Sequence, residues 1–264
     1  MQVREIAFTL GVLACAWTAQ ADVTIVAQMS GKMMGNNASG ETITYIKGNK
    51  MRTDQTQGRS KVSTIMDVDG GRVITINHGK KEAEVWDVTQ LSAALQGAKV
   101  DVSAADVTIT PGGETKQVAG YAATRHDISV SVDAGMPDAP IKMTLNISGP
   151  AYLSTEAPGQ ADYANFYINA AEKGFFFGDP RSARAQPGNA RGMMQMYRQM
   201  AAKGIPLEST QTVKMSGSGP MAGLLSRMGG GEMTTTVTRI SDETLQASMF
   251  EIPEGYKVKE QQVK

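Results

Sequence analysis

Few residue types in this sequence are suited to catalysis, and they do not form a known catalytic motif. Two histidines are present, His78 in a predicted turn and His126 in a predicted strand, and neither has the HExxH or HxxxH spacing of a metal site. The sequence has no GxSxG nucleophile motif, and its glycine clusters lack the Lys-Ser/Thr of a phosphate-binding loop. We therefore expect a protein that is not an enzyme and has no cofactor. A Ser/His/Asp triad built from distant positions would leave no local motif, so that alternative stays open.

Methionine is the unusual residue type of the chain, because four methionines lie close together on a predicted helix: Met193, Met194, Met196 and Met200. The flexible thioether side chain suits three roles. It can fill a core, or it can line a cavity for a flexible apolar ligand such as an acyl chain. It can also bind Cu(I) as a soft ligand, although no histidine or cysteine accompanies this cluster. A Met-rich periplasmic copper-binding protein is therefore the alternative to a ligand-binding protein.

Aromatic residues precede this helix in the sequence. Tyr163, Phe166 and Tyr167 recur at the spacing of one face of an amphipathic helix, and three consecutive phenylalanines, Phe175 to Phe177, follow. Together with the methionines, these residues suggest a hydrophobic binding site. As a hypothesis, the residues that line or cover it are Tyr163, Phe166, Phe175, Phe176, Met193, Met196, Tyr197 and Met200; no metal ligand is predicted.

The rest of the chain is rich in strands, and residues 42–88 predict an antiparallel meander. Short runs of β-forming residues alternate there with tight turns at Gly48-Asn49, at Asp69-Gly70-Gly71 and at residues 78–81. Short connections make consecutive strands antiparallel neighbours. Thr89 is predicted to begin a short helix that Gly97 ends.

Longer strands are predicted on either side of a helical insertion at about residues 159–203. We expect a loop or a wide hairpin end at residues 30–40, a loop at residues 178–192, and a strand that Pro111-Gly112-Gly113 ends. The sequence shows neither a fixed repeat nor a linker, so residues 22–264 are predicted to form one domain. The fold class is α+β and mainly β: a curved antiparallel sheet, or incomplete barrel, with the helices packed on its concave face.

The N-terminus has the three parts of a secretory signal. A basic start is followed by an apolar run and by Ala19-Gln20-Ala21, a small-x-small cleavage pattern, so residues 1–21 are predicted to be removed. The mature protein is then expected to be periplasmic or secreted. Cys15, the only cysteine, follows Val12-Leu13-Ala14, which loosely resembles a lipobox; lipidation at Cys15 is the less favoured alternative.

The overall charge excludes one class of partner. Lys and Arg number 26, and Asp and Glu number 26, with no block of basic residues. Nucleic-acid binding needs a basic face that releases counterions, so no nucleic-acid partner is expected.

Several phrases of the sequence resemble a known family: YIKGNKMR, TIMDVDGGRVITIN, VAGYAATRHDI and MFEIPEGYK. They are similar to a family of secreted bacterial proteins known as a domain of unknown function. That family's architecture is similar to the outer-membrane lipoprotein carriers and their receptor, the LolA/LolB-like superfamily. The resemblance implies an incomplete barrel around helices with an apolar concavity, and it transfers no functional residue.

The combined hypothesis is a periplasmic or secreted, non-enzymatic protein that binds a lipid or another hydrophobic ligand in the concave face of a half-barrel. A ligand-free envelope module, in which an exposed sheet edge pairs with an envelope protein partner, is a further alternative.

Overall fold

The computed structural model describes residues 22–33, 36–97, 105–133, 143–178, 180–185, 187–217, 223 and 230–262. The predicted signal peptide and Cys15 lie outside the described residues, and so does most of the segment between residues 216 and 231. Among the described helices, none is both long and apolar enough to cross a bilayer.

Within the described residues, twelve strands form a single sheet that does not close on itself, in the order β12-β6-β5-β4-β3-β2-β1-β11-β10-β9-β8-β7. Neighbouring strands are antiparallel, except for β12, which runs parallel to β6. The strands are β1 (Val23–Met33), β2 (Asn36–Lys47), β3 (Lys50–Gln57), β4 (Ser60–Asp67), β5 (Arg72–Asn77), β6 (Glu82–Asp87), β7 (Ala105–Val118), β8 (Tyr121–Asp133), β9 (Met143–Ser154), β10 (Ile205–Gly217), β11 (Gly230–Ser241) and β12 (Lys257–Gln262).

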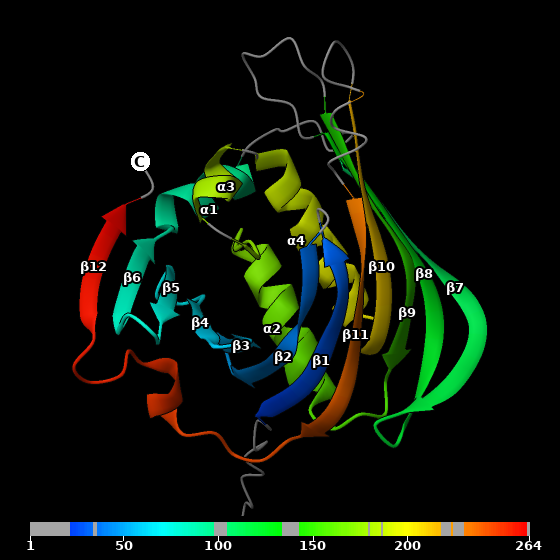
Figure 1. The fold of residues 1–264 in the computed structure, drawn as a ribbon, viewed down its shortest axis with the longest axis horizontal. Helices are drawn as coiled ribbons and strands as arrows, with labels where there is room; N and C mark the ends of the chain where they lie inside the picture. Colours follow the sequence, from blue (N-terminus) through cyan, green and yellow to red (C-terminus); the bar gives the residue numbers. More distant parts are fainter. Residues whose placement is uncertain are drawn as a thin grey trace, which may run out of the picture.

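The sheet curves around its helices. The helices of the described residues are α1 (Thr89–Gly97), α2 (Gln160–Glu172), α3 (Pro180–Ala185) and α4 (Pro187–Ala201), and a 3₁₀ turn, η2, covers Ala247–Phe250. Figure 1 shows α2 and α4 inside the curve, while the C-terminal segment passes outside it. The predicted fold class, a mainly β incomplete barrel with helices on its concave face, is confirmed.

The predicted meander is present as β2 to β6, in which each strand pairs with the next. The turn at Gly48 requires a positive φ, here 54°, which glycine adopts without a steric cost. Two of these turns also hold α2. The Asn169 side-chain amide donates to Asn49 Oδ1 at 3.0 Å, and Lys173 pairs with Asp69, to which Asn49 also donates. The meander and the helix therefore have a fixed relative position.

Alternate residues of a strand point to opposite faces of the sheet. In the meander, apolar residues on each face pack against another part of the chain. On the concave face, Met51, Met66 and Trp86 pack in the main core with Phe166 and other residues of the helical segment. On the convex face, a second apolar cluster contains residues of β4, β5 and β6 and is covered by the segment after β11, through Leu245, Phe250, Met249, Ile252 and Tyr256. The C-terminal segment therefore takes the place of a second layer there.

Two expectations were wrong, and a third held in one of its two forms. Residues 30–40 belong mostly to the paired strands β1 and β2, which is the hairpin and not the loop; β1 also pairs with β11, where Gly31 lets the backbone of Glu232 approach closely. Residues 178–192 contain α3 and the start of α4. Proline suits the first position of a helix, and Pro180 and Pro187 begin these two. Pro111-Gly112-Gly113 does not end a strand; it forms an irregularity inside β7, which continues to Val118.

Candidate functional site

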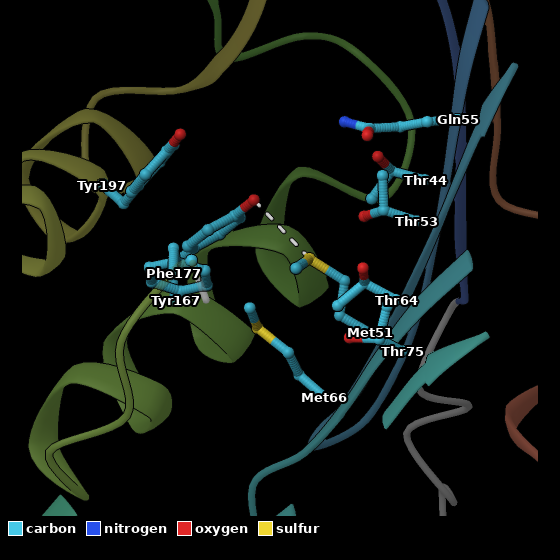
Figure 2. Close-up of a pocket in the computed structure, with 11 residues that line it drawn as sticks. Thr44, Met51, Thr53, Gln55, Thr64, Met66, Thr75, Tyr167, Phe177 and Tyr197 are labelled. Carbon is cyan, nitrogen blue, oxygen red and sulfur yellow. Dashed lines mark hydrogen bonds between the residues drawn. The ribbon is translucent and has the colours of Figure 1, made fainter. Parts of the chain in front are cut away.

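A cavity of about 530 Å³ lies between strands β2 to β5 and the helical segment. Its lining residues are Thr44, Met51, Thr53, Gln55, Thr64, Met66, Thr75, Tyr167, Phe177, Gly178 and Tyr197. Figure 2 shows Tyr167, Phe177 and Tyr197 on one side of the space and the side chains of the strands on the other. The cavity is partly open and has two chemically different walls.

The sheet wall is a row of four threonines in register. Thr44 pairs with Thr53, Thr53 with Thr64, and Thr64 with Thr75, so adjacent strands β2 to β5 each place one threonine in the row. Directly paired residues point to the same face of a sheet. We call this set of four residues the threonine row. It gives the cavity a wall of hydroxyl and methyl groups on a rigid support.

The opposite wall is aromatic and consists of Tyr167 from α2, Phe177 from the following segment and Tyr197 from α4. The rings of Tyr167 and Tyr197 stack with their centroids 5.6 Å apart and their planes at 17°. Phe177 lies 5.0 Å from Tyr167 and 4.8 Å from Tyr197, between centroids. Mutual packing of this kind fixes the rings, so we call these three residues the aromatic wall.

Two methionines of the sheet, Met51 and Met66, project between the two walls (Figure 2). The Tyr167 hydroxyl donates to Met51 Sδ at 3.7 Å, which links the aromatic wall to β3. Burial raises the pKa of both Tyr167 and Tyr197, so both phenols stay neutral at physiological pH. No charged side chain occurs among the described residues that line the cavity.

The structure places the sequence-predicted site residues in three groups. Tyr197 lines the cavity. Tyr163, Phe166, Phe175 and Phe176 are buried in the main core, with exposures of 4%, 0%, 1% and 1%. Met193, Met196 and Met200 pack on another apolar cluster formed mainly by β8 and β9. Sequence reasoning missed Tyr167, Phe177, Met51, Met66 and the threonine row as residues of the cavity.

A signal for the threonine row was present in the sequence. Partners in a hairpin are equidistant from its turn. Thr44 and Thr53 are equidistant from Gly48-Asn49, Thr53 and Thr64 from Gly58-Arg59, and Thr64 and Thr75 from the turn at residues 68–71. The positions of the turns therefore align the four threonines.

A serine, a histidine and an aspartate do meet on the convex face, but their order differs from that of a catalytic triad. The Ser63 hydroxyl donates to Asp54 Oδ1 at 2.7 Å, so its oxygen accepts from His78 Nε2, also at 2.7 Å. His78 Nδ1 then accepts from the Tyr256 hydroxyl at 2.9 Å. In a triad the aspartate orients the histidine, which removes the proton of the serine. Here the Ser63 hydroxyl donates its hydrogen bond to Asp54 and not to His78, and Ser63 is 0% exposed.

This polar cluster attaches the C-terminal segment to the sheet. Arg52 donates to the Met249 carbonyl oxygen at 2.7 Å and to Asp54 at 2.6 Å. Burial opposes the ionisation of Asp54, but the hydrogen bonds from Arg52 and Ser63 outweigh it and hold the pKa of Asp54 below its ordinary value. The cluster therefore keeps Asp54 ionised and attaches the C-terminal segment to the convex face.

No group of three or more His, Cys, Asp and Glu side chains suited to a metal ion occurs within the part of the chain that the structure describes. The methionines of α4 that the copper alternative uses are packed in apolar surroundings. Met196 and Met200 contact a cluster that contains Ile128 and Val130. Such packing is the usual role of methionine in a core.

These features define a class of protein: an open, curved sheet wrapped around helices, with a cavity between them whose described lining is uncharged. No protein-family model and no curated protein matches the chain. Among solved structures, PNGF-II is similar with 7% identity and a TM-score of 0.38, over 92% of this chain and 31% of that one. The chain thus spans less than a third of the length of PNGF-II.

Two further solved structures match over most of both chains. A LolA superfamily protein from Nitrosomonas europaea has 7% identity and a TM-score of 0.29, over 88% of this chain and 91% of that one. A DUF1329 family protein from Desulfovibrio piger has 8% identity and a TM-score of 0.31, over 89% and 91%. Both the LolA superfamily and a domain-of-unknown-function family thus occur among the similar structures, as the sequence resemblance predicted. At these TM-scores the likenesses give no information on ligand or activity.

Proposed function

We propose that this protein is a non-enzymatic binding protein that holds a small hydrophobic or amphiphilic molecule in the cavity between the threonine row and the aromatic wall. The observation that carries the proposal is the cavity itself. Its volume of about 530 Å³ is in the range of sites for small molecules. Such sites combine apolar side chains with fixed polar groups, and this lining has both: Met51, Met66 and the aromatic wall on one hand, and the polar threonine row on the other.

The packing around the cavity supports a role in ligand binding, because it holds the cavity wall in place. Phe166 packs against Tyr167 and Phe177, and Phe175 and Phe176 are buried in the same core, so that the aromatic wall is expected to keep its position without a ligand. A preformed site avoids the cost of ordering side chains when the ligand binds. In this proposal Tyr197 contacts the ligand, while the other predicted site residues act through the core that supports the wall.

The proposal includes the location of the protein. The signal-like residues 1–21 favour export to the periplasm or the medium, where the mature domain, residues 22–264, would bind its ligand. After cleavage at Ala21 the chain has no cysteine, so its stability depends on the core and the sheet alone.

Two measurements test this function. Native mass spectrometry of the protein purified from its host is expected to show a bound small molecule. A fluorescent fatty-acid analogue is expected to bind with a ratio of one to one. Thr64→Phe, which fills the cavity from the sheet side, should remove the probe signal.

Thr56→Phe is the matched control, because Thr56 is exposed and points away from Gln55, a residue of the cavity wall on the same strand. It should bind the probe as the wild type does. A clean apo mass together with no probe response would end the proposal, and so would equal loss of binding in both variants.

A further inference from the structure

The threonine row presents hydrogen-bonding groups that have no partner within the described residues. None of the hydroxyls of Thr44, Thr53, Thr64 and Thr75 makes a hydrogen bond in the described part of the chain, and neither does the Gln55 amide. Each hydroxyl can donate one hydrogen bond and accept two. Unpaired polar groups that face a cavity favour a ligand that pairs with them, because leaving them unpaired when a ligand displaces water is costly.

The row also has a defined length. Adjacent strands lie about 4.8 Å apart, so four threonines in register extend over roughly 14 Å. Beyond Thr44 the next residue in register is Ile25, which is apolar and 9% exposed. Beyond Thr75 it is Glu84, whose carboxylate accepts from Arg181 at 3.1 Å. The hydroxyl surface therefore ends at an apolar residue on one side and at an ion pair on the other.

The charge of the site disfavours an anionic group along the row. Among the described residues that line the cavity, none has a charged side chain. Arg181, the cation at the end of the row, already pairs with Glu84 and lies over the ring of Trp86, 4.3 Å from its centroid. A carboxylate or phosphate placed on the threonine row would lose hydration without gaining a cation, which is strongly unfavourable.

The aromatic wall lies opposite the threonine row (Figure 2) and accepts flat apolar surface. Aromatic side chains pack against apolar faces and leave the polar edges of a ligand free. A ligand that satisfies both walls has hydroxyls on one side and apolar surface on the other.

We propose that the ligand carries an uncharged, hydroxyl-rich group, such as a sugar or a polyol, that lies along the threonine row, with its apolar part against the aromatic wall. This inference rests on the proposed function, that the cavity binds a small molecule. The same chemistry is found in the head of an uncharged glycolipid and in a free neutral saccharide, and the test separates these two sources.

The test compares ligands that share one acyl or alkyl chain. The purified, delipidated full chain is titrated at neutral pH with lauric acid, methyl laurate and lauryl maltoside below its micelle concentration, and separately with maltose. Lauryl maltoside is expected to bind about tenfold or more tightly than methyl laurate, the equivalent of one or two net hydrogen bonds. Lauric acid should bind more weakly than methyl laurate at neutral pH, and protonating it at lower pH should reduce that difference.

Variants assign the preference to the threonine row. Thr53→Val and Thr64→Val keep the branched shape of the side chain and remove the hydroxyl. Each should reduce the advantage of lauryl maltoside over methyl laurate several-fold and leave the affinity for methyl laurate nearly unchanged. Thr56→Val, on the opposite face of β3, is the matched control and should keep the full advantage.

The outcomes distinguish the two proposals. Equal or tighter binding of lauric acid or methyl laurate, relative to lauryl maltoside, overturns this inference and leaves the binding function in place. An unchanged advantage in both valine variants also overturns it. If maltose binds as tightly as lauryl maltoside, the hydroxyl site is supported and the ligand is identified as a free saccharide, not a glycolipid. If none of the four compounds binds, both proposals fail.

Discussion

Tyr167 and Tyr197 stack at 17° with their centroids 5.6 Å apart, although one belongs to α2 and the other to α4. Their contact joins the two helices inside the curve of the sheet. It also places one flat aromatic surface opposite the threonine row, so that helix packing and cavity shape depend on the same pair of side chains.

Replacing Tyr197 separates these two roles. Tyr197→Ala should lower the free energy of unfolding by about 1–3 kcal/mol, because it removes the ring contacts with Tyr167 and Phe177 and leaves space between the helices. It should also weaken binding of the fatty-acid probe. Tyr197→Phe keeps the ring and is the control. Urea unfolding and probe titration measure both effects, and normal probe binding by Tyr197→Ala would contradict the role of the aromatic wall.

Phe176 belongs to the main core, is 1% exposed, and should act on stability. Phe176→Ala should lower the free energy of unfolding by about 3–5 kcal/mol, as removal of a buried ring usually does. Phe176→Leu, which keeps most of the volume, should cost clearly less. Chemical denaturation followed by circular dichroism tests this. A cost below about 1 kcal/mol for the alanine variant would show that Phe176 is not a core residue.

The local parts of this fold could be predicted from sequence. Turn residues such as Gly48-Asn49 specify hairpins through backbone conformation, and the aromatic spacing after residue 160 specifies α2. The residues that line the cavity could not be predicted in the same way. Phe175, Phe176 and Phe177 have the same side chain, yet two fill the core and the third lines the cavity. Only the path of the chain after Gly174 decides which one, and no periodicity describes that path.

The pairing of strands that are far apart in the chain also could not be predicted from the sequence. β12 pairs with β6 in parallel, and β1 pairs with both β2 and β11. These contacts depend on how the whole sheet curves. The local composition of residues 30–40 left a loop and a hairpin open, and the pairing of β1 with β11 supports the hairpin that forms.

The cluster around His78 predicts a dependence of stability on pH. Burial lowers the pKa of His78 below its ordinary value of 6.5, the charges of Lys61 and Arg52 lower it further, and Asp54 opposes them. The unfolded chain therefore binds the proton more readily than the native state does. This contribution to stability is present above a pH of about 6.5 and is lost as the pH falls through and below that value.

Urea unfolding at several pH values between about 7.5 and 5.5 checks this prediction, since the aspartates with lowered pKa values act only at lower pH. The wild type should lose stability on acidification in this range, and His78→Gln should lose less. Tyr256→Phe should cost about 1 kcal/mol at neutral pH, because His78 Nδ1 loses its donor. Identical pH profiles for the wild type and His78→Gln would contradict the assignment to His78.

Gly149 is predicted to tolerate no side chain. Its φ is 147°, and a Cβ there would collide with the Thr210 carbonyl oxygen on β10. Gly149→Ala should therefore cost roughly 3 kcal/mol or more, from backbone strain and from the displacement of β10. Gly113→Ala is the control, because Gly113 has a φ of 74° but nothing within 4 Å of the added Cβ. It should cost about 1 kcal/mol. Equal thermal stability of the two variants would contradict this reading of Gly149.

The way the two ends of the chain meet has a consequence for the rate of folding. Asp22 accepts a hydrogen bond from the backbone amide of Leu245, 223 positions later, and β1 needs β11 as a neighbour. The hairpins of the meander can form early, because their contacts are local. The sheet becomes continuous only when residues near the end of the chain reach its beginning, a step of high contact order that is intrinsically slow. Until then the β1 edge and the apolar convex face of the meander stay uncovered, and the chain is most prone to aggregate during that interval.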